Sequence, residues 1–136
     1  YVPCKKNDIE NALERIECNF SANGYRLPTE EEWEYAAKGG ESFRYSGSDN
    51  IDEVGWYQTE DYGAHLVKLL KPNGYGLYDM TGNVSEWISD YYDRTSRFVK
   101  GGSFADDASG CTLQSKELIK QDSKSKGIGF RVCQDE

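Results

Sequence analysis

The sequence is poor in several features that would have narrowed its function at once. Its 136 residues contain one histidine and four cysteines, and no two cysteines form a CxxC pair. A zinc ribbon is therefore disfavoured, because such sites are built from closely spaced ligand pairs. No apolar run is long enough to cross a bilayer and no signal peptide is recognisable, so we expect no direct membrane insertion by this segment.

Basic residues are also scarce. Lys and Arg number 16 against 24 Asp and Glu, which leaves a net charge of -8 and a pI near 4.7. Nucleic acid is not expected as a partner, because phosphate binding needs a basic face. The charge also disfavours anionic lipid, and improved solubility is the simplest interpretation of the acidic surface.

Two of the cysteines, Cys4 and Cys18, flank a short polar segment. They either close it as a disulfide or remain reduced, buried thiols. An even cysteine count in a small aromatic-rich chain favours an exported or cell-surface protein, whose leader or anchor would then be absent from this chain.

What the chain does contain is a helix signal in residues 24–40. Thr29 suits the N-cap and Glu32 completes a capping box, while Gly39-Gly40 ends the helix. Trp33, Ala36 and Ala37 would share its buried face.

Other elements are predicted to be short and separated by loops. We expect a helix within residues 7–16, a strand at 98–100 and a closing strand at 128–132. Aromatics make up 13% of the chain and glycines number 14, which favours large flat side chains packed between irregular turns. Residues 105–127 form a polar stretch without a predicted element.

Residues 76–92, GLYDMTGNVSEWISDYY, raise a chemical question. Asp79 and Glu86 lie on either side of a Gly-Asn bend, next to Trp87. A surface loop does not need the tryptophan and a core strand does not favour the acids. We therefore expect oxygens to converge here on something positive. The alternative is a turn whose carboxylates are solvated.

Four motifs in order, RLPTEEEWEYAAKGG, PNGYGLYDMTGNVSEW, KGGSF and GIGFRV, resemble the formylglycine-generating-enzyme (sulfatase-modifying-factor) domain over residues 24–132. The resemblance implies an α+β, C-type-lectin-like fold with low regular secondary structure and a small twisted antiparallel sheet with helices packed on it. The family's upstream motifs are missing, so we expect one domain over 1–136 that lacks its N-terminal part.

The resemblance also implies one structural calcium ion. In the family, the segment matching residues 76–92 holds calcium through positions equivalent to the side chains of Asp79 and Glu86 and the carbonyls of Gly82 and Val84. Calcium accepts such a mixed set of oxygens. A second family site needs an asparagine that residues 53–56 lack, so no second ion is expected.

The family's oxidase uses two cysteines shortly after GGS. In GGSFADDASGC, Cys111 matches the second, and Asp106 stands where the first would be. Copper-thiolate chemistry needs soft sulfur ligands, and a carboxylate is a hard one, so no copper and no catalytic residue are expected. Related iron-dependent sulfoxide synthases use a histidine cluster, whereas His65 is alone and is expected to pack or hydrogen bond in a loop.

The region from residue 97 to 132 also resembles the variable region of lectin-fold proteins diversified by retroelements, in which Asn codons are altered at their adenines. Ala108 and Cys111 sit where that pattern keeps fixed residues. Small polar residues are equally typical of any exposed loop, and both interpretations stay open. Five loop residues are reachable from an Asn codon by adenine changes alone: Ala105, Asp106, Asp107, Ser109 and Gly110.

These observations favour a ligand-binding display module, a calcium-stabilised scaffold that presents its C-terminal surface to a protein or other macromolecular ligand. The alternatives are a formylglycine-generating-type or related oxidase and a catalytically inactive assembly domain. We expect the five variable-like residues to be exposed, and Ser103 and Phe104 to point inward, Phe104 beside Trp87. The candidate ligand-binding residues are Ala105, Asp106, Asp107, Ser109, Gly110, Gln114, Ser115 and Glu117.

Overall fold

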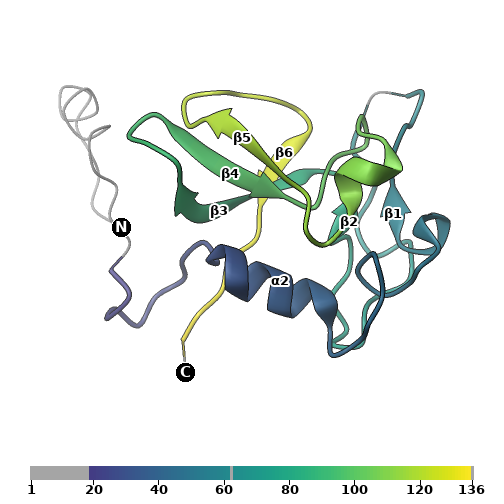
Figure 1. The fold of residues 1–136 in the computed structure, drawn as a ribbon, viewed down its shortest axis with the longest axis horizontal. Helices are drawn as coiled ribbons and strands as arrows, with labels where there is room; N and C mark the ends of the chain where they lie inside the picture. The colour runs from purple at the N-terminus through teal and green to yellow at the C-terminus, as the bar shows by residue number, and fades with distance from the viewer. Residues whose placement is uncertain (1–18, 62, 136) are drawn as a thin grey trace.

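The computed structural model describes residues 19–61 and 63–135, and shows one α-helix packed across a four-stranded sheet (Figure 1). The helix predicted within residues 7–16, together with Cys4 and Cys18, lies outside the described residues. The elements are α2 (Glu30–Lys38), η1 (Ile51–Glu53), β1 (Gly55–Trp56), β2 (Thr81–Gly82), β3 (Ser85–Tyr91), β4 (Ser96–Lys100), η2 (Ala108–Cys111), β5 (Lys116–Lys120) and β6 (Ile128–Phe130).

Helix α2 begins and ends as its sequence predicts. The Thr29 hydroxyl accepts a hydrogen bond from the Glu32 amide at 3.2 Å, and the Glu32 carboxylate accepts one from the Thr29 amide at 2.8 Å. Gly39 ends the helix in the left-handed region, at a φ of 62°. Trp33 and Ala37 are buried and Ala36 packs beside them. No helix in the described ranges is long and apolar enough to cross a membrane.

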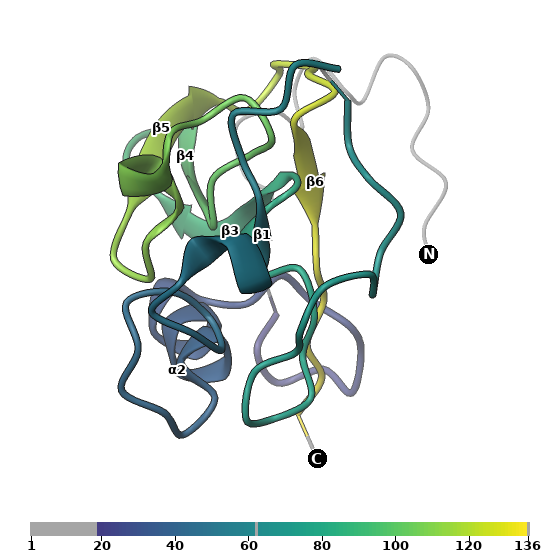
Figure 2. The same ribbon diagram turned by 90° about the vertical axis from the view of Figure 1, so that its right-hand side faces the viewer.

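The sheet has the strand order β5-β4-β3-β6 and confirms the predicted fold class with one difference in pairing. Strands β3, β4 and β5 pair antiparallel, as expected, but β6 runs parallel to β3. The chain leaves β4, forms η2 and β5, and crosses back to the opposite edge of β3, where it enters in the direction of β3 (Figure 2). The strands predicted at 98–100 and 128–132 correspond to β4 and β6.

Two strands of this four-stranded sheet lie where none was predicted. Residues 85–91 of the acidic, aromatic stretch form β3, a central strand of the sheet, although Glu86 had argued against a core strand. Residues 116–120 form β5, an edge strand within the stretch expected to be without regular structure. Its KELIK sequence is almost wholly exposed, so its apolar pattern was too weak to indicate a strand.

The core consists of two hydrophobic clusters. Ser103 and Phe104 are buried as predicted, with Phe104 only 6% exposed, whereas Trp87 is half-buried; neither aromatic belongs to these clusters. One cluster, between α2 and the sheet, contains Trp33, Ala37, Met80, Ile88 and Leu113. The other contains Tyr45, Ile51, Val54 and Cys111.

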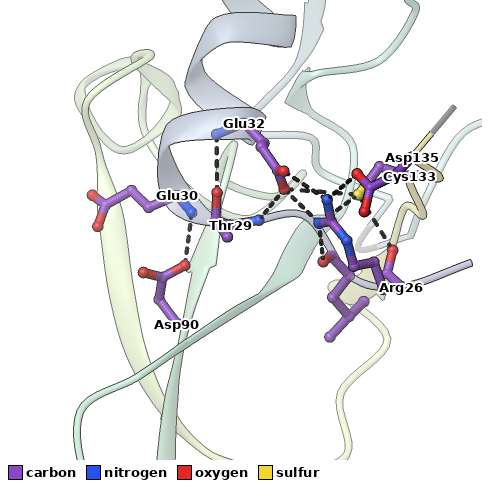
Figure 3. Close-up of polar contacts among 8 residues, drawn as sticks. Arg26, Thr29, Glu30, Glu32, Asp90, Cys133 and Asp135 are labelled. Carbon is purple, nitrogen blue, oxygen red and sulfur yellow. Dashed lines mark hydrogen bonds and ion pairs between the residues drawn. The ribbon is translucent and has the colours of Figure 1, made fainter. Parts of the chain in front are cut away.

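The C-terminal residues are fastened to the start of α2 (Figure 3). Arg26 and Cys133 exchange backbone hydrogen bonds of 3.0 and 2.9 Å, and the Arg26 guanidinium donates to Glu32 and Asp135 at 2.7 Å. These hydrogen bonds from Arg26 lower the pKa of Glu32 to about 2. Burial raises the pKa of the Cys133 thiol, so this network is a structural contact rather than a nucleophilic site.

Candidate functional site

One hollow gathers most of the candidate ligand-binding residues. It has a volume of about 190 Å³ and lies between β3, β4, η2 and the start of β5. We call it the η2 hollow. Five of the eight candidates line it, namely Asp106, Ser109, Gly110, Ser115 and Glu117, together with Ser85, Val99, Gly102 and Lys116.

Two aspartates give the loop above this hollow its shape. One oxygen of Asp106 accepts hydrogen bonds from both the amide and the hydroxyl of Ser103, each at 2.7 Å. Asp107 is the N-cap of η2 and accepts from the Ser109 hydroxyl at 2.6 Å and the Gly110 amide at 3.0 Å. These hydrogen bonds lower the pKa of Asp107. The loop is therefore an ordered turn that holds its own side chains.

This ordering changes part of the exposure prediction. Ala105, Asp107 and Ser109 are exposed as expected, and so are Gln114 and Glu117. The prediction is wrong for Asp106 and Gly110, which are half-buried. Asp106 turns back toward Ser103, and Gly110 lies against the Asp106 side chain. Ser115 is half-buried as well.

Ala108 and Cys111, the two positions expected to stay fixed, point toward the hydrophobic core. Ala108 packs on the cluster that contains Cys111, and Cys111 itself is only 1% exposed. Burial raises the pKa of the Cys111 thiol to about 12, and the nearby carboxylates of Asp106 and Asp107 add to the effect. The thiolate form that a nucleophile or a soft metal ligand needs is thus strongly disfavoured.

Three of the four predicted calcium ligands line a second hollow, of about 470 Å³, beside β6. We call it the β6 hollow. The fourth predicted ligand, Gly82, is not among its lining residues; it lies in β2, where a Cβ would collide with the Trp56 carbonyl oxygen. The lining residues are Asp79, Val84 and Glu86 with Val67, Lys68, Gly76, Leu77, Tyr78, Asn83, Phe130 and Arg131.

The Glu86 carboxylate already has its partners. Trp33 Nε1 donates to it at 2.7 Å, and the Arg131 guanidinium donates through Nη2 at 2.8 Å and Nε at 3.0 and 3.2 Å. Glu86 is only 5% exposed, so these bonds replace its hydration. The positive group on which oxygens of this stretch converge is thus, for Glu86, the guanidinium of Arg131.

Unlike Glu86, the Asp79 carboxylate has only one of its two oxygens bonded within the described residues. One carboxylate oxygen accepts from the Lys68 amide at 2.8 Å, whereas Oδ1 is buried and has no hydrogen-bond partner among the described residues. An unpartnered buried oxygen fits a cation. Within residues 19–61 and 63–135, however, no group of three or more His, Cys, Asp or Glu side chains is arranged to hold a metal ion. Asp79 therefore fits a calcium ion and Glu86, as paired here, does not.

His65 packs in a loop, as predicted, but it has a carboxylate neighbour that sequence reasoning missed. Its ring stacks on Trp56 with centroids 3.9 Å apart, and Nε2 lies 3.3 Å from an oxygen of Asp61. Asn83 fixes the backbone by accepting from the His65 amide at 2.8 Å. The sequence signal that could have revealed this contact is the four-residue spacing between Asp61 and His65. The contacts describe a packed ring rather than a catalytic cluster.

Ser85 and Lys116 are site residues that the sequence did not single out. They lie at the start of β3 and the start of β5, and only the pairing of these strands with β4 brings them to the η2 hollow. No local sequence pattern predicts that Ser85 and Lys116 lie in the same hollow, because only the pairing of β3, β4 and β5 in the folded sheet brings them together.

Comparison with known proteins agrees with this architecture. The sequence matches the family described as sulfatase-modifying factor enzyme 1-like domain over residues 5–136. Similar relatives are "Chaperone protein LppX" of Paenibacillus barcinonensis, 37% identical over 96% of this chain and 56% of the relative, and the formylglycine-generating enzyme of Streptomyces coelicolor, 32% identical over 82% and 47%. The chain thus spans about half the length of these relatives.

A solved structure extends the likeness to the fold. "Treponema denticola variable protein 1" has a TM-score of 0.81 and 34% identity, and the match covers 88% of this chain and 51% of that protein. The capping box of α2, the GGS turn and the closing GIGFRV strand are all in place in the described residues. The chain belongs to the sulfatase-modifying factor enzyme 1-like domain family and shares the C-type-lectin-like fold of variable protein 1.

Proposed function

We propose that this chain is a ligand-binding display module whose contact surface is the η2 hollow and the exposed residues around it, Ala105, Asp107 and Gln114. The observation that carries the proposal is the gathering of five of the eight candidate residues in one hollow. The positions that the diversification pattern would keep fixed, Ala108 and Cys111, instead pack against the hydrophobic cluster below. Three changeable positions, Ala105, Asp107 and Ser109, are exposed while the two fixed positions lie inward, which is the arrangement that a display surface requires.

The scaffold behind the hollow suits this role. Strands β3 and β4 form its wall, and Val99 of β4 is almost fully buried there. Side chains on loops held by a rigid scaffold commonly carry binding, because they are replaced without disturbing the core. The likeness to a variable protein over 88% of this chain supports the same interpretation. A module displayed to a protein or other macromolecular ligand would fit an exported or cell-surface protein.

The DNA around the gene offers a direct test of diversification. We expect a near-repeat of the 3′ end of the gene beside a reverse transcriptase. Among independent isolates, codons 105, 106, 107, 109 and 110 should then differ while codons 108 and 111 stay constant. Equal variation at codons 108 and 111 would leave only an ordinary tolerant loop.

Binding itself is tested by site-specific photo-crosslinking. A benzoylphenylalanine at Gln114, on the rim, should crosslink a macromolecule that the same group at Glu31, on the exposed side of α2, does not. The captured species is then purified and titrated against the native chain and a Ser109→Tyr variant. Retained affinity in the variant would place the contact elsewhere.

An oxidase of the formylglycine-generating kind is the second candidate, because a relative carries that activity in its name. The burial of Cys111 and the carboxylate at position 106 favour binding over oxidation, since a soft metal needs thiolate ligands. Incubation with copper, oxygen and a cysteine-containing sulfatase peptide tests it by mass spectrometry. Conversion above that of a Cys111→Ser variant would favour the oxidase over both the display module and an inactive assembly domain.

Calcium remains a proposal for the β6 hollow, and the unpartnered Oδ1 of Asp79 supports it. An ion bound only by the folded state raises the melting temperature by mass action, so a chelator should lower that temperature. Asp79→Ala should abolish the chelator effect. Asp61→Ala, which removes an exposed carboxylate outside this hollow, is the control and should keep it. An unchanged melting curve on chelation would exclude a structural ion at this site.

A further inference from the structure

The η2 hollow contains hydrogen-bond acceptors that are not used by the protein. Ser85 is only 4% exposed, lines the hollow, and its hydroxyl has no hydrogen-bond partner among the described residues. The Glu117 carboxylate, at the edge of the hollow, likewise makes no hydrogen bond or ion pair within the described part of the chain. Asp106 uses one oxygen for Ser103 and leaves the other free of such contacts. A hydroxyl that opens onto the hollow and has no protein partner is available to bond a ligand.

Lys116, the one cationic residue in the lining of this hollow, directs its ammonium group away from Asp106 and Glu117. Lys116 Nζ donates to both oxygens of Glu30 at 2.9 Å and lies over the Phe98 ring, 4.6 Å from its centroid. Its charge is therefore balanced by Glu30 and not by Asp106 or Glu117. The hollow keeps two carboxylates without a partner cation, in a chain whose net charge is -8.

From this geometry we infer that the η2 hollow takes a cationic side chain, a lysine ammonium or an arginine guanidinium, from a protein ligand. The inference rests on the proposed display function and names the chemistry that the surface recognises. Both groups are donors without an acceptor, which matches a lining rich in unused acceptors. The Asp106 and Glu117 side chains in the lining supply the carboxylates for the charged end. An anionic group would be repelled by the same carboxylates.

Small model ligands test the inference with the whole chain. N-acetyl-arginine amide and N-acetyl-lysine amide are titrated into ¹⁵N-labelled protein, with N-acetyl-norleucine amide as the neutral probe of similar length. The cationic probes should shift the amide signals of Ser85, Ser109, Gly110 and Ser115, and the neutral probe should not. Added salt should weaken the shifts, because the attraction is screened.

A matched pair of variants assigns the effect to this hollow. Glu117→Gln should weaken binding of the cationic probes about two- to fivefold, the range expected for an exposed charge pair. Glu31→Gln, the same change on the exposed side of α2, should leave binding unchanged. The inference is overturned if the neutral probe shifts the same signals equally, if no probe shifts them, or if both variants behave alike. Crosslinking at Gln114 with no cationic-probe shifts would retain the display function and reject only the cationic ligand.

Discussion

The β6 hollow and the η2 hollow both contain a glutamate from a strand of the same sheet, and the two glutamates are in opposite situations. Glu86 of β3, in the β6 hollow, is buried and bonded to Trp33 and Arg131. Glu117 of β5, in the η2 hollow, is exposed and makes no side-chain bond within the described residues. The bonding that the fold already supplies, rather than the residue type, separates a structural acid from one available to a ligand.

The difference follows from strand position. A central strand such as β3 is covered by α2 on one face, so a carboxylate there must be paired to compensate for lost hydration. An edge strand such as β5 leaves its side chains in water, where an unpaired carboxylate costs nothing. Acidic residues that look alike in the sequence are therefore paired within the fold in one hollow and left available to the proposed ligand in the other.

The largest effect is expected at a buried core residue outside the lining of the η2 hollow. Phe104→Ala removes a side chain that is only 6% exposed and should destabilise the fold by about 3–5 kcal/mol. Urea unfolding measures the change. Ligand preference should be retained at temperatures where the variant is folded, and a loss of stability below about 1 kcal/mol would contradict a core role.

Glu86→Gln tests the paired acid. Loss of its charge leaves the Arg131 guanidinium without its carboxylate, and removal of one partner from a buried ion pair costs about 3–5 kcal/mol. We expect about 3 kcal/mol, because the Arg131 side chain is 28% exposed and regains some hydration. Chemical denaturation of Glu117→Gln, measured alongside, should show almost no change. Similar losses in both variants would remove the distinction between the two hollows.

The N-cap of η2 should contribute less. Asp107→Ala removes the acceptor of the Gly110 amide and should cost about 1 kcal/mol, the usual value for a lost cap. Asp107→Asn keeps an acceptor oxygen and is expected to retain most of the stability. Thermal unfolding of the pair separates the cap from the charge, and equal losses in both would assign the effect to the negative charge.

The smallest change in stability is expected at the rim. Ser109→Tyr combined with Gln114→Tyr replaces exposed side chains and should alter the unfolding free energy by less than about 0.5 kcal/mol while changing ligand preference. Asp106 is left intact, because its bonds to Ser103 hold the turn. Binding to a captured partner is measured beside the unfolding curve. A variant that unfolds but binds normally would reverse the assignment of this surface.

Several features of the fold could be predicted because they depend on neighbouring residues. The capping box that starts α2 spans Thr29 to Glu32, and Gly39 ends the helix through its own backbone preference. The inward position of Phe104 follows from an aromatic side chain next to a tight turn. The spacing of the motifs was sufficient to identify the family, since four ordered motifs are a specific signature.

The sequence by itself therefore determined the helix α2, the strands β4 and β6 and the family, through short-range hydrogen bonding and the order of motifs. The tertiary structure alone decided which acids are paired. Glu86 meets Arg131 across 45 residues, and Ser85 reaches the η2 hollow only because β3 and β5 both pair with β4. Charge pairing depends on distance in space, and a sequence lists its carboxylates without the cations and donors that folding brings to each of them.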